Sequence, residues 1–318
     1  MSAVEYSLES FVDTTPRPLE SSRLDRLRAM ILMGGSVRPT RFSTAIQRAI
    51  MDLPADRGHR IMDLWRKELT GVLDDAGIDQ LPLRVLVNRT SHKPDVGRPD
   101  GRVLVSVEED PSDFRGKGGV LRDVCEEYDE DDYILTANAG QVLVEPLKYL
   151  VGEMVDMNAD VVLIGHRDGT PSGIMLIRCG CLKLVPHNGF IDMKEQALPV
   201  IAEHHVAKVV QKDIATGVPT RTLSDYITAL RRHHLHVKGE SLETNPFLEE
   251  DWRPVFGVLE DDTAMAPDAK FHDSVVLKGG RVENGAILVR SVVCPGATAK
   301  SGKRYVDKLV TAAGPVRG

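Results

Sequence analysis

Residues 28–36 read RAMILMGGS, and this stretch points to the fold of the chain. Its apolar run ends in the paired glycines Gly34 and Gly35. Such a run is typical of a buried strand in a parallel sheet. The glycines predict a tight turn that can receive a phosphate group, because a backbone without Cβ lets amide groups approach an anion closely. An ordinary strand followed by a turn would account for the stretch equally well.

Helical and extended patterns alternate along the residues that follow. Apolar residues recur at helical spacing from Ser43 onward, first in residues 43–54 and then in residues 59–78. The later predicted elements are strands 83–89 and 102–110, helix 118–128, strand 133–144, helix 146–158, strands 159–168, 173–185 and 205–211, and helix 222–237. This alternation predicts an α/β domain with a mostly parallel sheet covered by helices.

The pattern changes after Pro267. Residues 271–302 contain short β-branched clusters separated by Gly or Asn at close to six-residue spacing, including VVLKGG, RVENGA, ILVRSV and VCPGAT. This spacing is typical of a parallel β-helix, although a pair of ordinary hairpins would also fit. The predicted organisation is an extension over 1–24, an α/β domain over 25–240, a linker over 241–266 and a short β-helix with a tail over 267–318.

Composition narrows the classes of partner. The 318 residues carry a net charge of -7, so no overall positive field attracts nucleic acid or an anionic membrane. The four cysteines have no metal-binding spacing, which indicates reduced thiols. No apolar run approaches the ~20 residues of a membrane helix, and the N-terminal residues are acidic, unlike a signal peptide. We therefore expect a cytoplasmic protein.

The glycine-rich stretch resembles the first motif of the sugar-phosphate nucleotidyltransferases, also called NDP-sugar pyrophosphorylases. Residues 33–42, MGGSVRPTRF, and 47–54, QRAIMDLP, match their GGxGTRLxP loop and the KPxLP segment after it. The resemblance implies a Rossmann-like, GT-A-like mixed sheet followed by a left-handed β-helix. It also implies that Gly34, Gly35 and Ser36 bind a nucleotide, that Arg38 neutralises the triphosphate, and that Arg48 replaces the usual lysine.

A second match lies in residues 115–122, RGKGGVLR, at the start of a predicted helix. In the family a GTAGxL element at this place approaches the base of the nucleotide. The resemblance therefore implies that Gly116, Gly118 and Gly119 bind the nucleotide, since glycines at a helix N-terminus allow close contact. A plain strand-to-helix loop is the alternative interpretation.

A third match is GFIDMKEQALP in residues 189–199, which resembles the segment after the sugar-contacting region of bacterial members. It implies that Lys194 and Glu195 contact the sugar phosphate. Residues 212–216, KDIAT, resemble the family's DIGTP, whose aspartate helps to bind the catalytic Mg²⁺. Asp213 is therefore the candidate metal ligand and a candidate catalytic residue.

Two departures from the family pattern leave the activity open. The strand that ends in the principal metal-binding aspartate in active relatives reads ILTANAGQ here, and Asn138 offers only a neutral oxygen to a nucleotide or a metal. The hairpin that contacts the sugar is missing between Asp160 and Gly173. Histidines in residues 204–205 and 233–236 lack the spacing of a zinc site and are interpreted as solvated helix ends.

Three functions follow as hypotheses. The first is an enzyme that transfers a nucleotidyl group from an NTP to a sugar 1-phosphate, which gives an NDP-sugar and pyrophosphate, with Mg²⁺ as cofactor. The second is a catalytically silent relative that binds a nucleotide or sugar nucleotide and regulates or assembles a partner. The third is a structural module whose β-helix forms a homo-oligomer, because the ends of a short β-helix are open.

Overall fold

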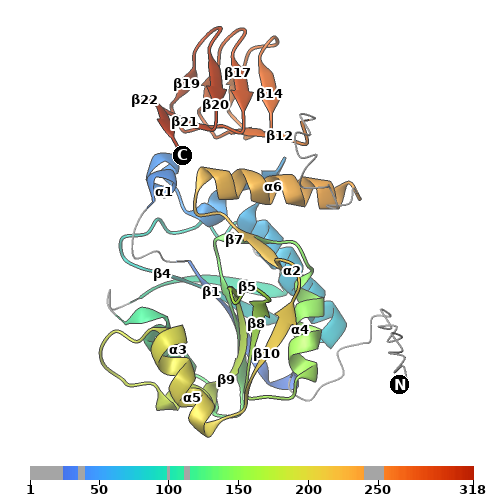
Figure 1. Cartoon of the computed structure of the whole chain (residues 1–318), viewed down its shortest axis with the longest axis vertical. Coiled ribbons are helices and arrows are strands. Elements are labelled where there is room, and N and C mark those ends of the chain that lie inside the picture. The colour runs from blue at the N-terminus through green and yellow to red at the C-terminus, as the bar shows by residue number, and fades with distance from the viewer. Residues whose placement is uncertain (1–23, 35–39, 99–100, 111–114, 240–253) are drawn as a thin grey trace, which may run out of the picture.

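The computed structural model describes residues 24–34, 40–98, 101–110, 115–239 and 254–318. Figure 1 shows an α/β domain with a coil of short strands at one end, and helix α6 (Leu223–Val237) lies between the two parts. Of the residues that carry predicted site roles, Gly35, Ser36 and Arg38 lie outside the described ranges. Their roles remain predictions.

A seven-stranded sheet forms the centre of the α/β domain, in the order β10-β8-β9-β6-β1-β4-β5. Every neighbouring pair is parallel except the two pairs made by β9. The strands are β1 (Leu27–Met33), β4 (Leu81–Val87), β5 (Val103–Glu109), β6 (Tyr133–Asn138), β8 (Val161–His166), β9 (Pro171–Arg178) and β10 (Ala207–Lys212). The predicted mixed α/β sheet is confirmed.

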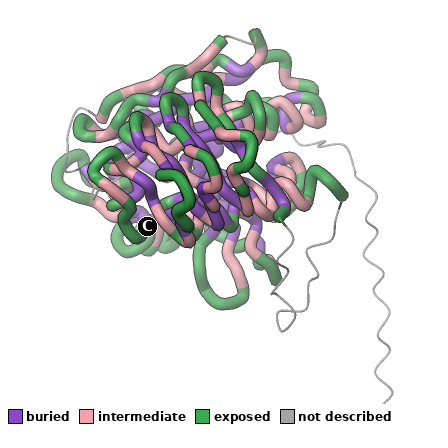
Figure 2. Tube along the Cα trace, turned by 90° about the horizontal axis from the view of Figure 1, so that it is seen from above, coloured by how far each residue is buried: buried purple, intermediate pink, exposed green. Residues whose placement is uncertain are grey.

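Helices cover both faces of this sheet because successive side chains of a strand point to opposite faces. In β1, Met30 and Leu32 belong to one core, whereas Ala29 and Ile31 belong to the other. The first core includes α2 (Ile61–Ala76), α4 (Leu147–Asp156) and α6, and the second includes α3 (Gly116–Cys125) and α5 (Leu198–His204). Figure 2 shows the buried strands between exposed outer segments.

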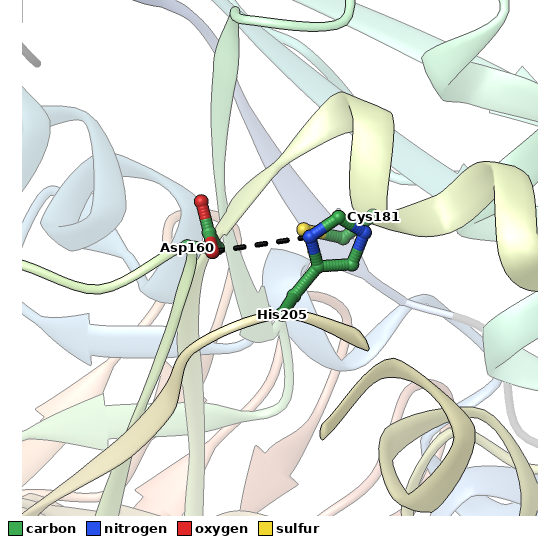
Figure 3. A group of neighbouring side chains, drawn as sticks. All are labelled: Asp160, Cys181 and His205. Atoms are coloured by element: carbon green, nitrogen blue, oxygen red, sulfur yellow. Dashed lines mark ion pairs between the residues drawn. The ribbon is translucent and has the colours of Figure 1, made fainter. Parts of the chain in front are cut away.

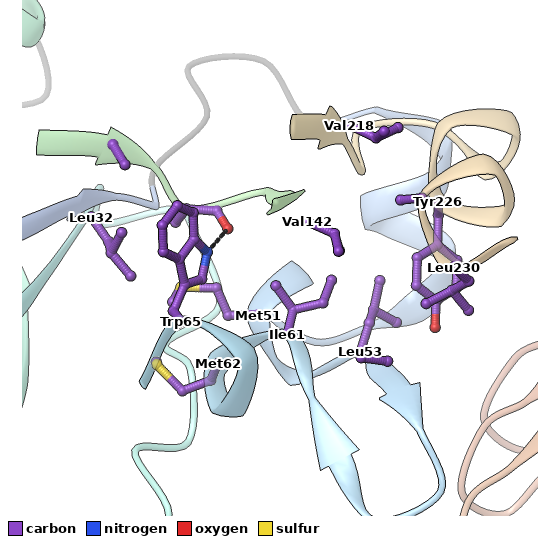
Figure 4. Close-up of a cluster of buried hydrophobic side chains, with 14 of the residues drawn as sticks. Leu32, Met51, Leu53, Ile61, Met62, Trp65, Val142, Val218, Tyr226 and Leu230 are labelled. Carbon is purple, nitrogen blue, oxygen red and sulfur yellow. Dashed lines mark hydrogen bonds between the residues drawn. The ribbon is translucent and has the colours of Figure 1, made fainter. Parts of the chain in front are cut away.

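Two large polar-tipped side chains are fully enclosed in the first core (Figure 4). The Trp65 indole Nε1 donates a hydrogen bond of 3.0 Å to the backbone oxygen of Ala139, directly after β6. The Tyr226 hydroxyl donates one of 2.6 Å to the backbone oxygen of Pro54. Because each buried polar tip has a partner, Trp65 fixes α2 against the segment after β6, and Tyr226 fixes α6 against residue Pro54.

The helix predicted over residues 43–54 is shorter in the structure. Helix α1 spans Arg41–Ile46, and Gln47 takes a left-handed conformation with φ of 53° that ends it. A separate 3-10 turn, η2 (Ile50–Asp52), follows. The remaining short elements of this domain are η1 (Leu24–Arg26), β2 (Pro54–Asp56), β3 (His59–Arg60), β7 (Gln141–Leu143), η3 (Cys179–Leu184), η4 (Met193–Ala197) and β11 (Gly217–Pro219).

The C-terminal coil consists of three stacks of parallel strands, as a β-helix requires. The strands are β12 (Gly257–Leu259), β13 (Ala264–Met265), β14 (Lys270–His272), β15 (Ser274–Val276), β16 (Arg281–Val282), β17 (Ile287–Val289), β18 (Val292–Val293), β19 (Thr298–Ala299), β20 (Arg304–Val306), β21 (Lys308–Thr311) and β22 (Gly314–Arg317). Strand β22 pairs antiparallel with β21 and ends the stack. The left hand expected for the coil remains a prediction.

One turn of the coil takes 17 residues, which places Ser291 directly above Ser274. Three hexads would need one residue more, so one of the three sides is a residue shorter. In successive turns, one end of this short side is marked by a left-handed residue, which is Asp273, Arg290 or Asp307.

The coil starts earlier than the predicted position 267, because β12 already pairs with β15. A three-residue strand with one buried side chain was too short to recognise from its pattern.

The coil rests on helix α6 through polar and aromatic contacts. The carboxylate of Asp273 is almost fully buried, accepts hydrogen bonds from the backbone amides of Val255 and Phe256, and pairs with Arg231. The His234 ring stacks on Phe256 with centroids 5.2 Å apart. The interpretation of residues 233–236 as solvated is therefore wrong for two residues. His234 packs into this junction, and the largely buried ring of His233 lies against His234 and 3.6 Å from Asp56.

None of the helices within the described ranges is both long and apolar enough to cross a membrane.

Candidate functional site

Two cavities flank the carboxyl ends of the neighbouring strands β1 and β6. One has a volume of about 520 Å³ and is bordered by Met33 and Asn138, the last residues of these strands. The other has a volume of about 500 Å³ and is bordered by the next residues, Gly34 and Ala139. Ligands of open α/β sheets bind beyond the carboxyl ends of the strands, so both cavities lie where a ligand site is expected. We name them the Lys117 cavity and the Arg48 cavity.

Lys117 and Asn138 meet at the edge of the first cavity. The Lys117 ammonium donates a hydrogen bond of 2.7 Å to the Asn138 side-chain oxygen. Helix α3 supplies Lys117 in its first turn, and β6 supplies Asn138 at its carboxyl end. An amide oxygen is neutral, so this partner orients the ammonium without cancelling its charge.

The electrostatic surroundings of Lys117 are mixed. The Lys117 side chain is accessible to solvent, but only within a cavity that protein atoms surround. The resulting partial desolvation is the main cause that lowers the pKa of its ammonium below the usual value. Asp192 acts to raise that pKa, and the positive charge of Arg221 lowers it further. Both the desolvation and the positive charge of Arg221 disfavour the charged form of Lys117, and a bound anion would favour it.

The third sequence match forms the opposite wall of this cavity. The Asp192 carboxylate caps the turn η4 and accepts hydrogen bonds of 2.8 Å from the backbone amides of Lys194 and Glu195. Lys194 borders the Lys117 cavity, and its ammonium lies 4.0 Å from the Glu195 carboxylate. Both of these side chains are mostly exposed. Their predicted contact with a sugar phosphate is not tested by this geometry.

The glycines of the second match lie against the protein's own backbone. Gly116 has φ of 68°, and a Cβ there would come within 2.4 Å of the Ile191 oxygen. The Gly118 amide donates a hydrogen bond of 3.0 Å to that same oxygen. A Cβ on Gly119 would meet the Arg115 guanidinium at 3.0 Å. Close approach explains all three glycines, but their contact partners here are the 191 segment and Arg115, and nucleotide contact remains a prediction.

The Arg48 cavity has a different lining. Gly34 directly follows β1 here, and its amide donates a hydrogen bond of 2.8 Å to the Leu86 oxygen of β4. Hydroxyl side chains of Ser43, Thr44 and Thr90 contribute to the wall. The Arg48 guanidinium donates hydrogen bonds of 2.8 and 3.0 Å to the two carboxylate oxygens of Glu260, which belongs to the C-terminal coil. The positive charge of Arg48 is thus already neutralised by the second domain.

Asp213 lies outside both cavities as the structure describes them. It follows β10, its side chain is 66% exposed, and its carboxylate pairs with Arg167 at 2.5 Å. A Mg²⁺ site in a protein is usually built on carboxylates. Among the described residues that line the two cavities, Asp192 alone carries a carboxylate, and one of its oxygens caps η4. The described lining of the two cavities therefore offers a single carboxylate to a Mg²⁺ ion, and the predicted Mg²⁺ site remains a prediction.

Asp160, Cys181 and His205 form a separate group whose ligand atoms lie within 4.8 Å of one another (Figure 3). Arg178 donates a hydrogen bond of 2.9 Å to one Asp160 oxygen, and the Val206 amide donates one of 3.0 Å to the other. Burial raises the pKa of the Cys181 thiol to about 11, so the thiolate needed for metal binding is scarce at neutral pH. The guanidinium already supplies the positive charge, and the group is interpreted as an ion-pair network.

The sequence predicted nucleotide-binding roles for the glycines around Lys117 but no role for Lys117 itself. It also gave no role to Arg221 and did not anticipate that Glu260 binds Arg48. A signal for Lys117 was present, because a lysine in the first turn of a glycine-rich helix start is placed at the carboxyl edge of a parallel sheet. Glu260 carried no such signal, since it reaches Arg48 from a distant part of the chain.

No known family model matches the chain, and no curated protein matches it. Solved structures do. HddC from Yersinia pseudotuberculosis superposes with a TM-score of 0.47 at 14% identity, over 65% of this chain and 100% of HddC. The structure of HddC in complex with GMP-PN superposes with a TM-score of 0.48 at 15% identity, again over 65% of this chain and 100% of HddC.

A structure from Bacillus anthracis, assigned as a glucose-1-phosphate thymidylyltransferase and solved with a sucrose, has a TM-score of 0.50 at 13% identity. That match covers 64% of this chain and 94% of the other. At this identity the likeness concerns the fold. The α/β domain of the chain therefore shares its fold with that structure.

Proposed function

We propose that the protein transfers a nucleotidyl group from an NTP to a sugar 1-phosphate, with an NDP-sugar and pyrophosphate as products. The observation that carries the proposal is the pair of similar cavities on the two sides of the β1 and β6 carboxyl ends, with a cationic side chain at their edge. Two substrates that react with each other need two adjoining sites, and phosphorylated substrates need positive charge.

In this reaction the protein forms no covalent bond to the substrates and acts by positioning them and by stabilising their charge. An oxygen of the sugar phosphate attacks the α-phosphorus of the NTP, and the bond from that phosphorus to the pyrophosphate oxygen breaks. The nucleophile is already ionised at neutral pH, so no general base is needed. In this proposal Lys117 lowers the repulsion between the anions, while Gly34 and the predicted nucleotide-binding residues after it orient the nucleotide.

A panel of NTPs combined with sugar 1-phosphates tests the proposal by release of pyrophosphate. The expected result is release that needs both substrates together, in one or a few combinations. Absence of release in every combination, at high protein concentration and with Mg²⁺, Mn²⁺ or a chelator, would reject the activity.

A second candidate is a protein that binds a nucleotide or sugar nucleotide without transfer. The lack of a carboxylate set for Mg²⁺ among the described residues of the two cavities favours it. This function predicts that a nucleotide or NDP-sugar raises the thermal unfolding midpoint without any pyrophosphate release, because a ligand that binds only the folded state stabilises it.

A further inference from the structure

The carboxyl end of β6 presents an ammonium group in place of a carboxylate. Active members of the family that the sequence resembles hold Mg²⁺ on an aspartate of this strand, and here the strand ends in Asn138. The Asn138 oxygen is occupied by the Lys117 ammonium at 2.7 Å. A divalent cation at this oxygen would have to displace Lys117 or lie beside it, and either arrangement is opposed by Coulomb repulsion.

The charge of Lys117 is not consumed by an ion pair. Within the described ranges no carboxylate lies within ion-pair distance of its ammonium, and its hydrogen-bond partner is a neutral amide. Asp192 is the carboxylate that most affects it, yet two backbone amides bind an Asp192 oxygen. Lys194 borders the same cavity, but its ammonium lies 4.0 Å from the Glu195 carboxylate. Within the described residues, Lys117 is therefore the lysine of this cavity whose charge is not matched by an ion pair.

We propose that Lys117 supplies to the phosphates of the bound ligand the positive charge that a divalent metal would otherwise supply, so that ligand binding needs no metal ion. The inference rests on the proposed function in that it takes the ligand to be a phosphate ester or diphosphate. It holds for a transferase and for a silent binder alike, because it concerns the binding of the phosphates.

The test measures binding of inorganic pyrophosphate and of the five common nucleoside diphosphates by calorimetry, once in excess chelator and once in Mg²⁺. The wild-type protein is expected to bind pyrophosphate, and at least one nucleotide, about as well in the chelator as in Mg²⁺. Lys117→Met is expected to weaken binding in the chelator by about 10- to 100-fold, as for loss of a hydrogen bond to a charged group. Lys117→Arg keeps the charge and should recover most of the affinity.

The variant Asn138→Asp tests the same inference by adding a carboxylate beside Lys117, which should make binding depend on Mg²⁺. Its carboxylate would pair with Lys117 and cancel the charge, so binding in the chelator should fall by at least about 10-fold. The same carboxylate can hold Mg²⁺, so added Mg²⁺ should restore part of the affinity in this variant. Lys183→Ala, which removes an exposed lysine paired with Glu130 on another part of the surface, is the matched control and should bind like wild type.

Each outcome bears on the inference. Wild-type binding that appears only with Mg²⁺, or Lys117→Met binding as tightly as wild type in the chelator, would overturn it. Metal-free pyrophosphate binding that depends on Lys117, without binding of any nucleotide, would support the site and reject the proposed function. If no probe binds in either medium, both fail. Circular dichroism and thermal melting establish that each variant is folded.

Discussion

The two cavities at the strand ends differ in the partner of their basic side chain. Lys117 has a neutral amide as its partner, whereas Arg48 has the carboxylate of Glu260. The first arrangement leaves positive charge available to a ligand, and the second uses it to attach the C-terminal coil to the α/β domain. The difference teaches that a basic residue next to a ligand-sized cavity indicates an anion site only after its partner is known.

The same distinction applies to the glycines of the two regions. A Cβ on Gly34 would make close contacts of 3.3 to 3.4 Å with Val85, Leu86 and Val87, all on β4. A Cβ on Gly116 would meet the backbone of Ile191. The backbone contact requires glycine at Gly116, whereas at Gly34 the neighbours on β4 would have to shift by a few tenths of an ångström.

The largest expected effect comes from Gly116→Ala, which would break the support of Lys117. The new Cβ would lie 2.4 Å from the Ile191 oxygen at a residue with positive φ, so backbone must move. We expect the free energy of unfolding to fall by about 2–4 kcal/mol. Urea denaturation measures it, and pyrophosphate affinity should fall as well.

Gly58→Ala is the matched control for this variant. Gly58 has φ of 96°, but a Cβ there would meet no atom within 4 Å. Its cost should be limited to the left-handed backbone, about 1–2 kcal/mol. Equal losses in the two variants would mean that the contact with Ile191 contributes nothing.

Glu260→Gln would make the Arg48 cavity more like the Lys117 cavity. A neutral amide in place of the carboxylate leaves the partly buried guanidinium of Arg48 with uncompensated charge. We expect a loss of about 1–2 kcal/mol in unfolding free energy, because the ion pair joins the two domains. Pyrophosphate affinity should rise several-fold, since a second free cation then faces a cavity.

Calorimetry on Glu260→Gln and on Asp262→Asn separates this effect from a change in net charge. Asp262 belongs to the same coil and forms an exposed ion pair with Lys278. Its substitution changes the net charge of the protein equally without freeing Arg48. A gain in affinity of the same size in both variants would contradict the assigned role of Glu260.

The junction between the domains should weaken in mild acid because of two histidines. Burial is the largest cause that lowers the pKa of His233, and it also lowers the pKa of His234, whose Nε2 lies 3.0 Å from the Ala55 oxygen. Asp56 and Lys67 also face His233, with opposite effects on its pKa. Both rings are therefore preferentially neutral in the folded protein.

The sign of the pH dependence follows from these shifts. Unfolded histidine titrates near pH 6.5, so below that pH the unfolded chain takes up protons before the folded one does. The contribution of these histidines to stability is complete above pH 6.5 and is lost as the pH falls through their lower folded pKa values. Urea titrations from pH 8 to 5 should show the decline, and the double variant H233Q/H234Q should show a smaller slope. An unchanged slope would assign the decline to other groups.

The smallest effect is expected for Asp213→Asn. The carboxylate and its partner Arg167 are both mostly exposed, and such ion pairs contribute at most about 0.5 kcal/mol. We also expect no change in the response of ligand binding to Mg²⁺, measured as for Asn138→Asp. A loss of Mg²⁺-dependent binding in Asp213→Asn would restore Asp213 as a metal ligand.

Several features of the protein follow from the sequence alone. The apolar run after Leu27 and the helical spacing in residues 59–78 depend on neighbours along the chain, so the order of strands and helices could be predicted. The hexad spacing predicted the coil for the same reason. The glycine-rich start of α3 also marked the edge of the sheet where the candidate site lies.

Only the tertiary structure decided which charges remain available at that edge. Asn138 and Lys117 are 21 residues apart, and Arg48 and Glu260 are 212 apart. A side chain's charge is cancelled or preserved by whatever lies within a few ångströms, and those neighbours come from unrelated parts of the chain. The sequence therefore determined where the candidate ligand edge lies. The packing of helix, sheet and coil determined that, among the described residues, Lys117 has no carboxylate partner there, whereas Arg48 is paired with Glu260.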